Sequence, residues 1–226
     1  MGGCHFDYLK MDKIEKIINL LKRDYPKFRT PIVTEYAEKT RNPFKVLISC
    51  LLSLRTKDET TAKASERLFG LASTPEEIVK LSEEKIRDAI YPVGFYKTKA
   101  KRIKEICERL IEEYNSKVPD SIDELLKLKG VGRKTANLTI TQGYGKLGIC
   151  VDTHVHRISN RLGLVKTKTP EKTEFALREL LPKKFWIVYN DLLVSYGQNV
   201  CVPISPFCSK CSISKFCERI GVERSR

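Results

Sequence analysis

The stretch Leu128–Asn137 reads LKGVGRKTAN, and it places two glycines just before an Arg-Lys-Thr run. A phosphate-binding P-loop also combines glycines with a lysine. It needs four residues between its first glycine and its Gly-Lys pair, and it follows a strand. Here Arg133 precedes Lys134, and the preceding segment SIDELLKL has helical periodicity. The stretch therefore predicts a helix, a tight Gly-x-Gly hairpin and a second helix.

The two hairpin glycines, Gly130 and Gly132, permit positive φ and leave backbone N–H groups without a covering Cβ. Such donors beside a helix N-terminus form an anion site that fits one phosphate. A helix-hairpin-helix of this kind binds the phosphate of a nucleic-acid backbone, and that contact positions the protein without reading bases.

Helical periodicity dominates the rest of the chain, and strand alternation is nearly absent, so we predict an all-α protein. Pro43 opens one predicted helix, and Asp58 is the expected N-cap of the next. The predicted helices cover 11–24, 43–54, 58–72, 74–82, 82–90, 97–114, 121–128, 132–144, 153–164, 169–181 and 185–198.

The composition narrows the class of protein and of partner. Hydrophobic residues make up 41% of the 226 positions and charged residues 31%, which excludes a disordered or membrane-embedded chain. No apolar run is long enough to span a bilayer, and the first residues lack the features of a secretory signal, so we expect a cytoplasmic protein without a membrane partner. The net charge of +14 favours a polyanionic partner.

Four cysteines near the C-terminus form the pattern C-x6-C-x2-C-x5-C, and they are Cys201, Cys208, Cys211 and Cys217. Disulfides are disfavoured in a cytoplasmic protein, so the pattern predicts a metal-organised loop. Zinc sites usually offer two short C-x2-4-C pairs, whereas only one pair here is that close. The wide, uneven spacing favours thiolates around an iron–sulfur cluster, with zinc as the alternative.

Lys134 follows the hairpin within the first helical turn and admits two interpretations. The simpler one is a cation that contacts phosphate. The other is a nucleophile that attacks a sugar C1′ and forms a Schiff base. That chemistry needs a carboxylate, which Asp152 in the segment VDTH could supply at the start of the next helix. The alternative for Asp152 is a plain helix N-cap.

Three motifs in order, LKGVGRKTAN, VDTHVHRISNR and the cysteine quartet, resemble the endonuclease III family of helix-hairpin-helix (HhH-GPD) DNA glycosylases. The segments PFKVLISCLLSLRTKD and VGFYKTKA are also similar to that family, and the resemblance spans about residues 14–220. It implies a bifunctional enzyme of base excision repair that flips and excises oxidised pyrimidines and then cleaves the strand by β-elimination. It also implies that the four cysteines bind a 4Fe-4S cluster.

The resemblance assigns roles residue by residue. Lys134 matches the Schiff-base lysine and Asp152 the catalytic aspartate. The hairpin that grips a DNA phosphate corresponds to Gly130, Val131 and Gly132, and Arg133 directly after it is also expected to bind DNA.

Two positions depart from the family pattern but keep a DNA-binding role. Arg55 stands where many members have a glutamine that fills the gap left by the flipped base, and a guanidinium can stack and donate there. Phe95 stands where a leucine wedge is common, and a phenyl ring can intercalate.

The resemblance further implies two helical domains with a DNA-binding cleft between them. We expect residues 36–146 to form a helical barrel and residues 1–35 and 147–226 to form a terminal domain that carries the cluster loop. The expected partner is double-stranded DNA that contains damaged pyrimidines or abasic sites, bound by a monomer near the nucleoid. Further phosphate contacts are expected from Lys57, Lys97, Lys99, Lys101, Arg102, Lys210 and Lys215.

Two other functions remain open at this stage. One is a monofunctional glycosylase for uracil or mismatched thymine. The other is a non-catalytic, metal-containing DNA-binding protein. For His154 and His156, two residues apart on a predicted helix, shared metal binding is disfavoured because they do not lie on one face. We expect His154 to be a structural hydrogen-bonding residue.

Overall fold

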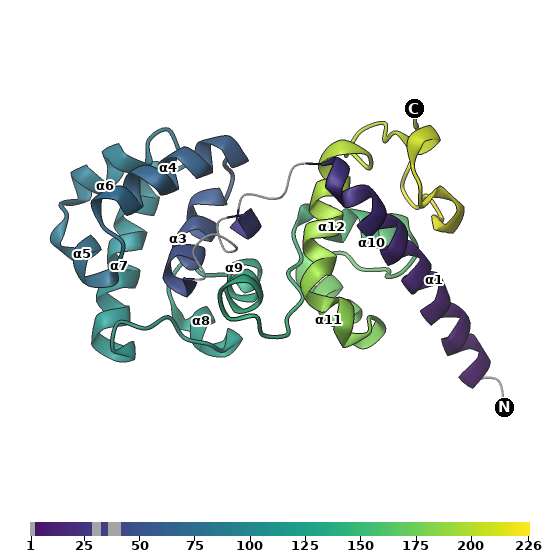
Figure 1. Cartoon of the computed structure of the whole chain (residues 1–226), viewed down its shortest axis with the longest axis horizontal. Helices are drawn as coiled ribbons and strands as arrows, with labels where there is room; N and C mark the ends of the chain where they lie inside the picture. The colour runs from purple at the N-terminus through teal and green to yellow at the C-terminus, as the bar shows by residue number, and fades with distance from the viewer. Residues whose placement is uncertain (1–2, 29–32, 36–41) are drawn as a thin grey trace. The chain divides into compact units, whose positions relative to one another are not determined.

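The computed structural model of the protein describes residues 3–28, 33–35 and 42–226 (Figure 1). Within these residues the regular structure is helical and contains no strand, which confirms the all-α prediction. No helix in the described part of the chain is both long and apolar enough to cross a membrane.

The chain divides into two compact units. One comprises Met1–Thr30 together with Ile149–Arg226, and the other comprises Pro31–Gly148. We call them the terminal unit and the central unit. The block predicted as a barrel, 36–146, lies inside the central unit, so the expected boundaries fall within five residues of the observed division.

The central unit is built around two helices, α3 and α7, each of which packs against several others. α7 packs against α5, α6 and α3, and α3 packs against α4 and α9. Its buried core includes Leu47, Ile48, Leu68, Ile103 and Leu125. The helices are α3 (Pro43–Ser53), α4 (Asp58–Leu71), α5 (Pro75–Lys80), α6 (Glu83–Ile90), α7 (Tyr96–Tyr114), α8 (Ile122–Lys127) and α9 (Arg133–Leu138), followed by the π-helical turn η2 (Thr139–Gly143).

Side-chain caps explain where several of these helices begin. Asn42 Oδ1 accepts hydrogen bonds from the backbone N–H of Phe44 and Lys45 at the start of α3. Thr74 and Glu77 form a capping box at α5. The prediction that Asp58 caps α4 is wrong, because Asp58 lies one position inside the helix. In that position its negative carboxylate still interacts favourably with the positive end of the helix dipole.

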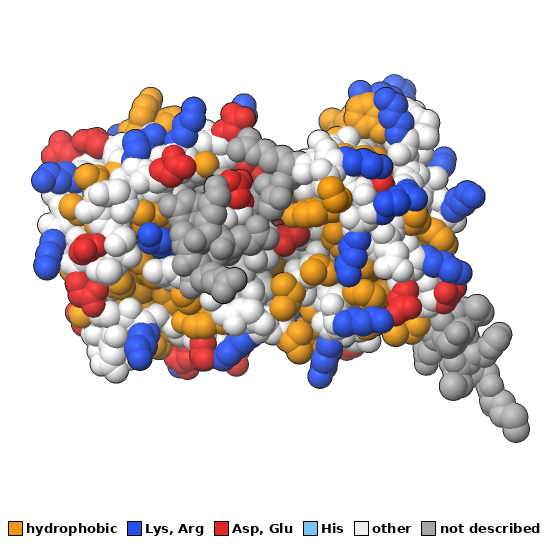
Figure 2. Space-filling model, in the orientation of Figure 1, with side chains coloured by type: hydrophobic (Ala, Val, Ile, Leu, Met, Phe, Trp, Pro, Cys, Tyr) orange, Lys and Arg blue, Asp and Glu red, His pale blue; other side chains and the backbone are white. Residues whose placement is uncertain are grey.

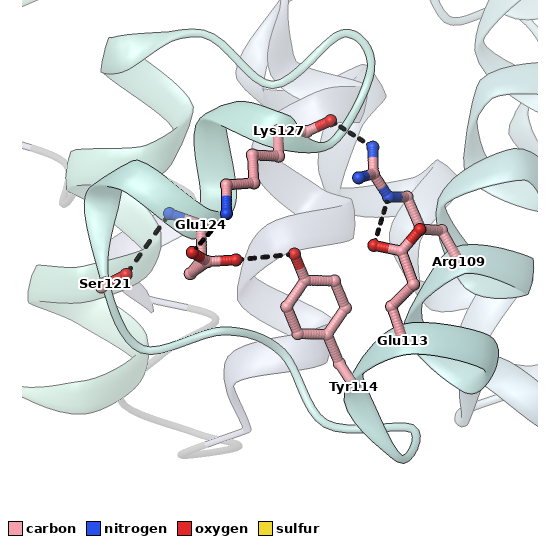
Figure 3. Close-up of polar contacts among 6 residues, drawn as sticks. All are labelled: Arg109, Glu113, Tyr114, Ser121, Glu124 and Lys127. Carbon is pink, nitrogen blue, oxygen red and sulfur yellow. Dashed lines mark hydrogen bonds and ion pairs between the residues drawn. The ribbon is translucent and has the colours of Figure 1, made fainter.

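Polar contacts join the end of α7 to α8 directly before the hairpin (Figure 3). Tyr114 Oη donates to Glu124 Oε2 at 2.9 Å, and Lys127 Nζ donates to Glu124 Oε1 at 2.6 Å. Arg109 donates to the carbonyl of Lys127 and is itself held by Glu113 Oε2 at 2.9 Å. The helix that leads into the hairpin is therefore fixed to the longest helix of the central unit.

The terminal unit packs its first helix against its last long one. Ile14, Ile17, Ile18 and Leu21 of α1 are buried, and α12 contacts both α1 and α10. The elements of this unit are α1 (Gly3–Asp24), η1 (Tyr25–Lys27), α10 (Thr153–Arg161), α11 (Pro170–Leu180), η3 (Lys183–Phe185), α12 (Trp186–Asn199), η4 (Cys208–Lys210) and η5 (Ser214–Phe216).

Candidate active site

The hairpin turn requires glycine at its first position for two reasons. Gly130 has φ +86°, a region that side chains rarely adopt. A Cβ at Gly130 would also lie 2.9 Å from Cδ of Arg102 on α7. The sequence prediction of a Gly-x-Gly hairpin between two helices is confirmed.

The second half of the hairpin has one buried residue, Val131, and one exposed residue, Gly132. Val131 is buried, and its N–H donates to the carbonyl of Leu128 at 3.0 Å. Gly132 is the N-cap of α9, and no described atom lies within 4 Å of the position of a Cβ there. An exposed backbone at Gly132 is what the predicted phosphate contact of this hairpin requires, and that contact stays a prediction.

Lys134 occupies the second position of α9 and is half-buried. It lies close enough to α3 for its charge to act on the Cys50 thiol. Burial raises the pKa of Cys50 to about 12, and the positive charge of Lys134 opposes that rise. Cys50 therefore remains a neutral thiol at physiological pH and does not compete as a nucleophile.

Asp152 belongs to the terminal unit and caps α10. Its Oδ1 accepts hydrogen bonds from the N–H of His154 at 2.8 Å and of Val155 at 2.9 Å. The interpretation of Asp152 as a helix N-cap is thus confirmed. Among the described residues no hydrogen bond reaches Oδ2, so one oxygen fixes the carboxylate and the other remains available.

The segment that carries Asp152 is anchored from behind. Cys150 and Val151 are buried, and Asn190 Nδ2 on α12 donates to the carbonyl of Cys150 at 3.1 Å. This hydrogen bond holds the backbone just before the helix N-terminus, so the position of the carboxylate is set by the core of the terminal unit.

Arg55 and Phe95 lie side by side in the central unit. Arg55 follows α3, and Phe95 is the N-cap of α7. The guanidinium carbon of Arg55 is 5.5 Å from the centroid of the Phe95 ring, which is a cation–π arrangement. The ring is 62% exposed despite its apolar character. An exposed aromatic residue beside a guanidinium suits contact with bases, and that role stays a prediction.

Lys99 differs from the prediction that it contacts phosphate. Its Nζ donates to the carbonyls of Leu52 and Leu54 and to Thr56 Oγ1, within the protein. The helical spacing contained a signal for this, because Lys99 shares a face with the buried Ile103 and with Ile106 one turn further. In a chain with a net charge of +14, a lysine is more readily interpreted as a phosphate contact than as an interior residue.

The four cysteines of the quartet line one cavity of the terminal unit, together with Arg161 and apolar residues such as Phe207. Several donors reach the sulfur atoms: Arg161 Nη1 donates to Cys201 Sγ at 3.3 Å, and Tyr196 Oη donates to Cys211 Sγ at 3.3 Å. Donors of this kind stabilise thiolates that ligate a cluster. No group of three His, Cys, Asp or Glu side chains in the described residues is arranged to hold a single metal ion.

The two histidines of α10 have separate partners. His154 Nδ1 lies 3.1 Å from Arg157 Nη2, and His156 Nδ1 lies 2.7 Å from Thr173 Oγ1. Gly197 on α12 is needed beside the first of them, because a Cβ at Gly197 would lie 2.5 Å from His154 Nδ1. Both imidazoles thus take part in packing α10 within the terminal unit.

On the face drawn in Figure 2, the basic side chains are dispersed over both units and do not gather in one patch. Figure 2 shows Lys and Arg side chains scattered over the visible face of each unit, with Asp and Glu side chains between many of them. The charge of +14 therefore supports general attraction to a polyanion.

The comparisons with known proteins agree with this geometry. The model of the HhH-GPD superfamily base excision DNA repair proteins matches residues 48–183. Endonuclease III of Thermotoga maritima is 52% identical over 180 residues, which cover 80% of this chain and 84% of that protein. The mouse endonuclease III-like protein 1 is 44% identical over 77% of this chain, which spans 59% of the length of that longer protein.

Two solved structures have a fold similar to that of this chain. A trapped endonuclease III–DNA covalent intermediate superposes with a TM-score of 0.83 at 33% identity, covering 92% of this chain and 96% of that one. A thermostable thymine-DNA glycosylase superposes with a TM-score of 0.79 at 25% identity, covering 93% and 95%.

The chain belongs to the HhH-GPD superfamily of base excision DNA repair proteins. Within it the chain is similar to endonuclease III, and it is a DNA glycosylase with AP lyase activity.

Proposed function

We propose that the protein excises oxidised pyrimidines from double-stranded DNA and cleaves the strand at the abasic site, with Lys134 as nucleophile and Asp152 as the carboxylate that assists it. The observation that carries this proposal is the place of Lys134, one residue into the helix that follows the Gly-x-Gly hairpin. A phosphate gripped at the hairpin would bring the adjoining sugar within reach of that amine.

The first half of the reaction breaks the bond between base and sugar. The damaged nucleotide is extruded from the duplex so that its C1′ becomes accessible. The lone pair of Lys134 Nζ forms a bond to C1′, and the bond from C1′ to the base breaks. Its electron pair leaves with the base, which is protonated. Positive charge develops on the sugar during this step, and Asp152 Oδ2 stabilises it.

The second half breaks the strand. The secondary amine on C1′ opens the sugar ring and becomes a protonated Schiff base. Loss of a proton from C2′ then expels the 3′ phosphate by β-elimination, and water finally releases Lys134 from the sugar fragment. Atoms and electrons balance without any redox partner, so the chemistry needs only the amine, the carboxylate and water.

The cysteine quartet fits a 4Fe-4S cluster as the group that organises the C-terminal loop. Four thiols line one cavity, and Arg161 and Tyr196 donate to two of the sulfurs. When bound, such a cluster supplies four iron–thiolate bonds that hold a loop with little apolar content of its own. Iron and acid-labile sulfide analysis of the purified protein distinguishes it from zinc.

DNA binding in this proposal combines the hairpin, the basic surface and the Arg55–Phe95 pair. Gly130, Val131, Gly132 and Arg133 contact a phosphate, while Arg55 and Phe95 enter the gap left by the extruded nucleotide. The protein acts as a monomer at the nucleoid, where its substrate lies.

Strand cleavage without added alkali tests the proposal. Duplexes with one thymine glycol are incubated with the wild type, with Lys134→Gln and with Lys85→Gln, an exposed lysine of α6 that serves as the matched control. The wild type and Lys85→Gln should release the base and nick the strand, and Lys134→Gln should do neither at a measurable rate. Normal nicking by Lys134→Gln would remove Lys134 from the mechanism.

A second candidate function is removal of mismatched thymine, favoured by the structural match to a thymine-DNA glycosylase. It predicts release of thymine opposite guanine and strand breaks that appear only after alkali. The presence of a lysine at position 134, which an enzyme limited to base removal does not need, favours the first candidate.

A further inference from the structure

Arg55 and Phe95 lie in two neighbouring turns of the central unit, and both have a left-handed backbone conformation although neither is glycine. Arg55 has φ +53° and Phe95 has φ +59°. Such residues are uncommon and persist where the surrounding structure fixes them, often at sites of function. The two turns lie at opposite ends of different helices, one after α3 and one before α7.

The two turns touch through their backbones. A Cβ at Gly94 would lie 2.5 Å from the carbonyl oxygen of Arg55, so only glycine permits this approach. The N–H of Gly94 donates to Thr56 Oγ1 at 3.1 Å. The hydroxyl of Thr56 in turn donates to the carbonyl of Leu54 at 3.2 Å. The turn that presents Phe95 is thus hydrogen-bonded to the turn that presents Arg55.

Lys99 connects both turns to the end of α3. From one helical turn beyond Phe95, its Nζ donates to the carbonyl of Leu52 at 2.8 Å and to the carbonyl of Leu54 at 2.6 Å. A third hydrogen bond of 3.3 Å runs to Thr56 Oγ1. The last carbonyls of a helix lack partners within the helix, and a cation there satisfies them. The ammonium is therefore the point at which α3, the Arg55 turn and α7 meet.

We propose that Lys99 is a positioning residue that holds Arg55 and Phe95 as one preassembled wedge for the gap opened in the duplex. The proposal rests on the proposed function, because it assumes that the protein extrudes a nucleotide. Inserting side chains into a base stack has an unstacking cost, and a wedge ordered in advance adds little further entropic cost on binding. Lys99 itself does not touch DNA in this scheme.

A direct readout of insertion uses duplex DNA with an abasic-site analogue opposite 2-aminopurine, whose fluorescence reports unstacking. At saturating protein the wild type should change the fluorescence, and Lys99→Met should lose most of that change. Lys104→Met is the matched control, since Lys104 also lies on α7 and donates to a carbonyl, that of Leu81, away from both turns. A full change with Lys99→Met, or none with the wild type, would overturn the proposal.

Kinetics separate positioning from general destabilisation. Lys99→Met should lower kcat/KM for thymine glycol release roughly 10- to 100-fold, as misplacement of a binding element does. Combined with Arg55→Ala and Phe95→Ala, it should add less than about twofold, because the wedge is already gone. Losses that multiply would contradict the proposal. If Lys99→Met fails to fold by circular dichroism, Thr56→Val, which removes only the bridging hydroxyl, takes its place in both experiments.

The two proposals fail in different ways. A wild-type protein that neither releases base nor nicks the strand contradicts the proposed function. A wild-type protein that does both, with Lys99→Met indistinguishable from it, contradicts only the positioning role of Lys99.

Discussion

The guanidinium of Arg55 lies over the ring of Phe95 at 5.5 Å, although the two residues belong to turns at the ends of different helices. Both backbones are left-handed, and the ring is largely exposed. The pair presents a flat, cationic surface that can stack on a base and donate to it.

Replacing Phe95 by smaller residues should test whether its ring intercalates between bases. Phe95→Ala removes the wedge and should lower kcat/KM for thymine glycol release by roughly 10- to 100-fold, whereas Phe95→Leu should stay within about threefold because a leucine can still separate a base step. Steady-state kinetics on one duplex gives both values. Equal losses for the two variants would show that the residue is needed for local packing and not for intercalation.

The hairpin glycines should separate stability from DNA binding. Gly130→Ala should reduce the free energy of unfolding by about 1–3 kcal/mol, because φ is positive and Arg102 occupies the space of a Cβ. Gly132→Ala has neither problem and should leave stability within about 0.5 kcal/mol while weakening DNA affinity, since its Cβ would cover the open backbone. Urea unfolding and DNA titration distinguish the two; unchanged affinity in Gly132→Ala would argue against a phosphate contact there.

The two roles of Asp152 should also separate. Asp152→Asn keeps a side-chain oxygen for the N-cap, so its free energy of unfolding should match that of the wild type while base release falls by about 100-fold or more. Asp152→Ala should lose the activity and also about 1 kcal/mol of stability. Near-normal turnover by Asp152→Asn would reduce the residue to a cap.

The burial of Lys99 predicts how stability changes with pH. Burial lowers the pKa of Lys99 from 10.5 to about 8 in the folded protein. Between these values the unfolded chain binds a proton that the folded chain has lost, so the contribution of Lys99 to the free energy of unfolding rises with pH through this window, by about 1–2 kcal/mol. Measured as wild type minus Lys99→Met, the difference should increase from pH 8 to pH 10. A flat difference would show that the three acceptors keep the amine charged.

Removal of one of the four proposed cluster ligands should disorganise the C-terminal loop. Cys208→Ser should abolish the visible absorbance of the purified protein and its bound iron, whereas Cys107→Ala, at a buried cysteine of the central unit, should retain both. An iron content unaffected by Cys208→Ser would contradict the assignment of the quartet.

Much of the fold follows from local patterns. The helices α3 and α5 begin directly after Asn42 and Thr74, whose side chains cap them, and the Gly-x-Gly spacing predicts the hairpin because Gly130 must adopt positive φ. The cysteine spacing likewise predicts a shared site, and the four thiols line one cavity.

What the sequence does not reveal depends on contacts between distant segments. Nothing in SLRTKD or GFYKTKA alone predicts that Gly94 meets the carbonyl of Arg55. The interior role of Lys99 depends on carbonyls at the end of α3, which come within reach of its amine only when α3 and α7 are packed together. Asp58 is the first residue of α4 and the residue before it, Lys57, makes no side-chain cap, so a capping residue type near a helix start does not by itself fix the cap position.

The central claim is that Lys134 becomes covalently attached to the sugar. Wild-type protein, mixed with a duplex that contains thymine glycol and reduced with borohydride, should form a stable protein–DNA adduct. After proteolysis, mass spectrometry should place the sugar fragment on the peptide that contains Lys134. An adduct on any other residue, or base release with no adduct at all, would contradict the account.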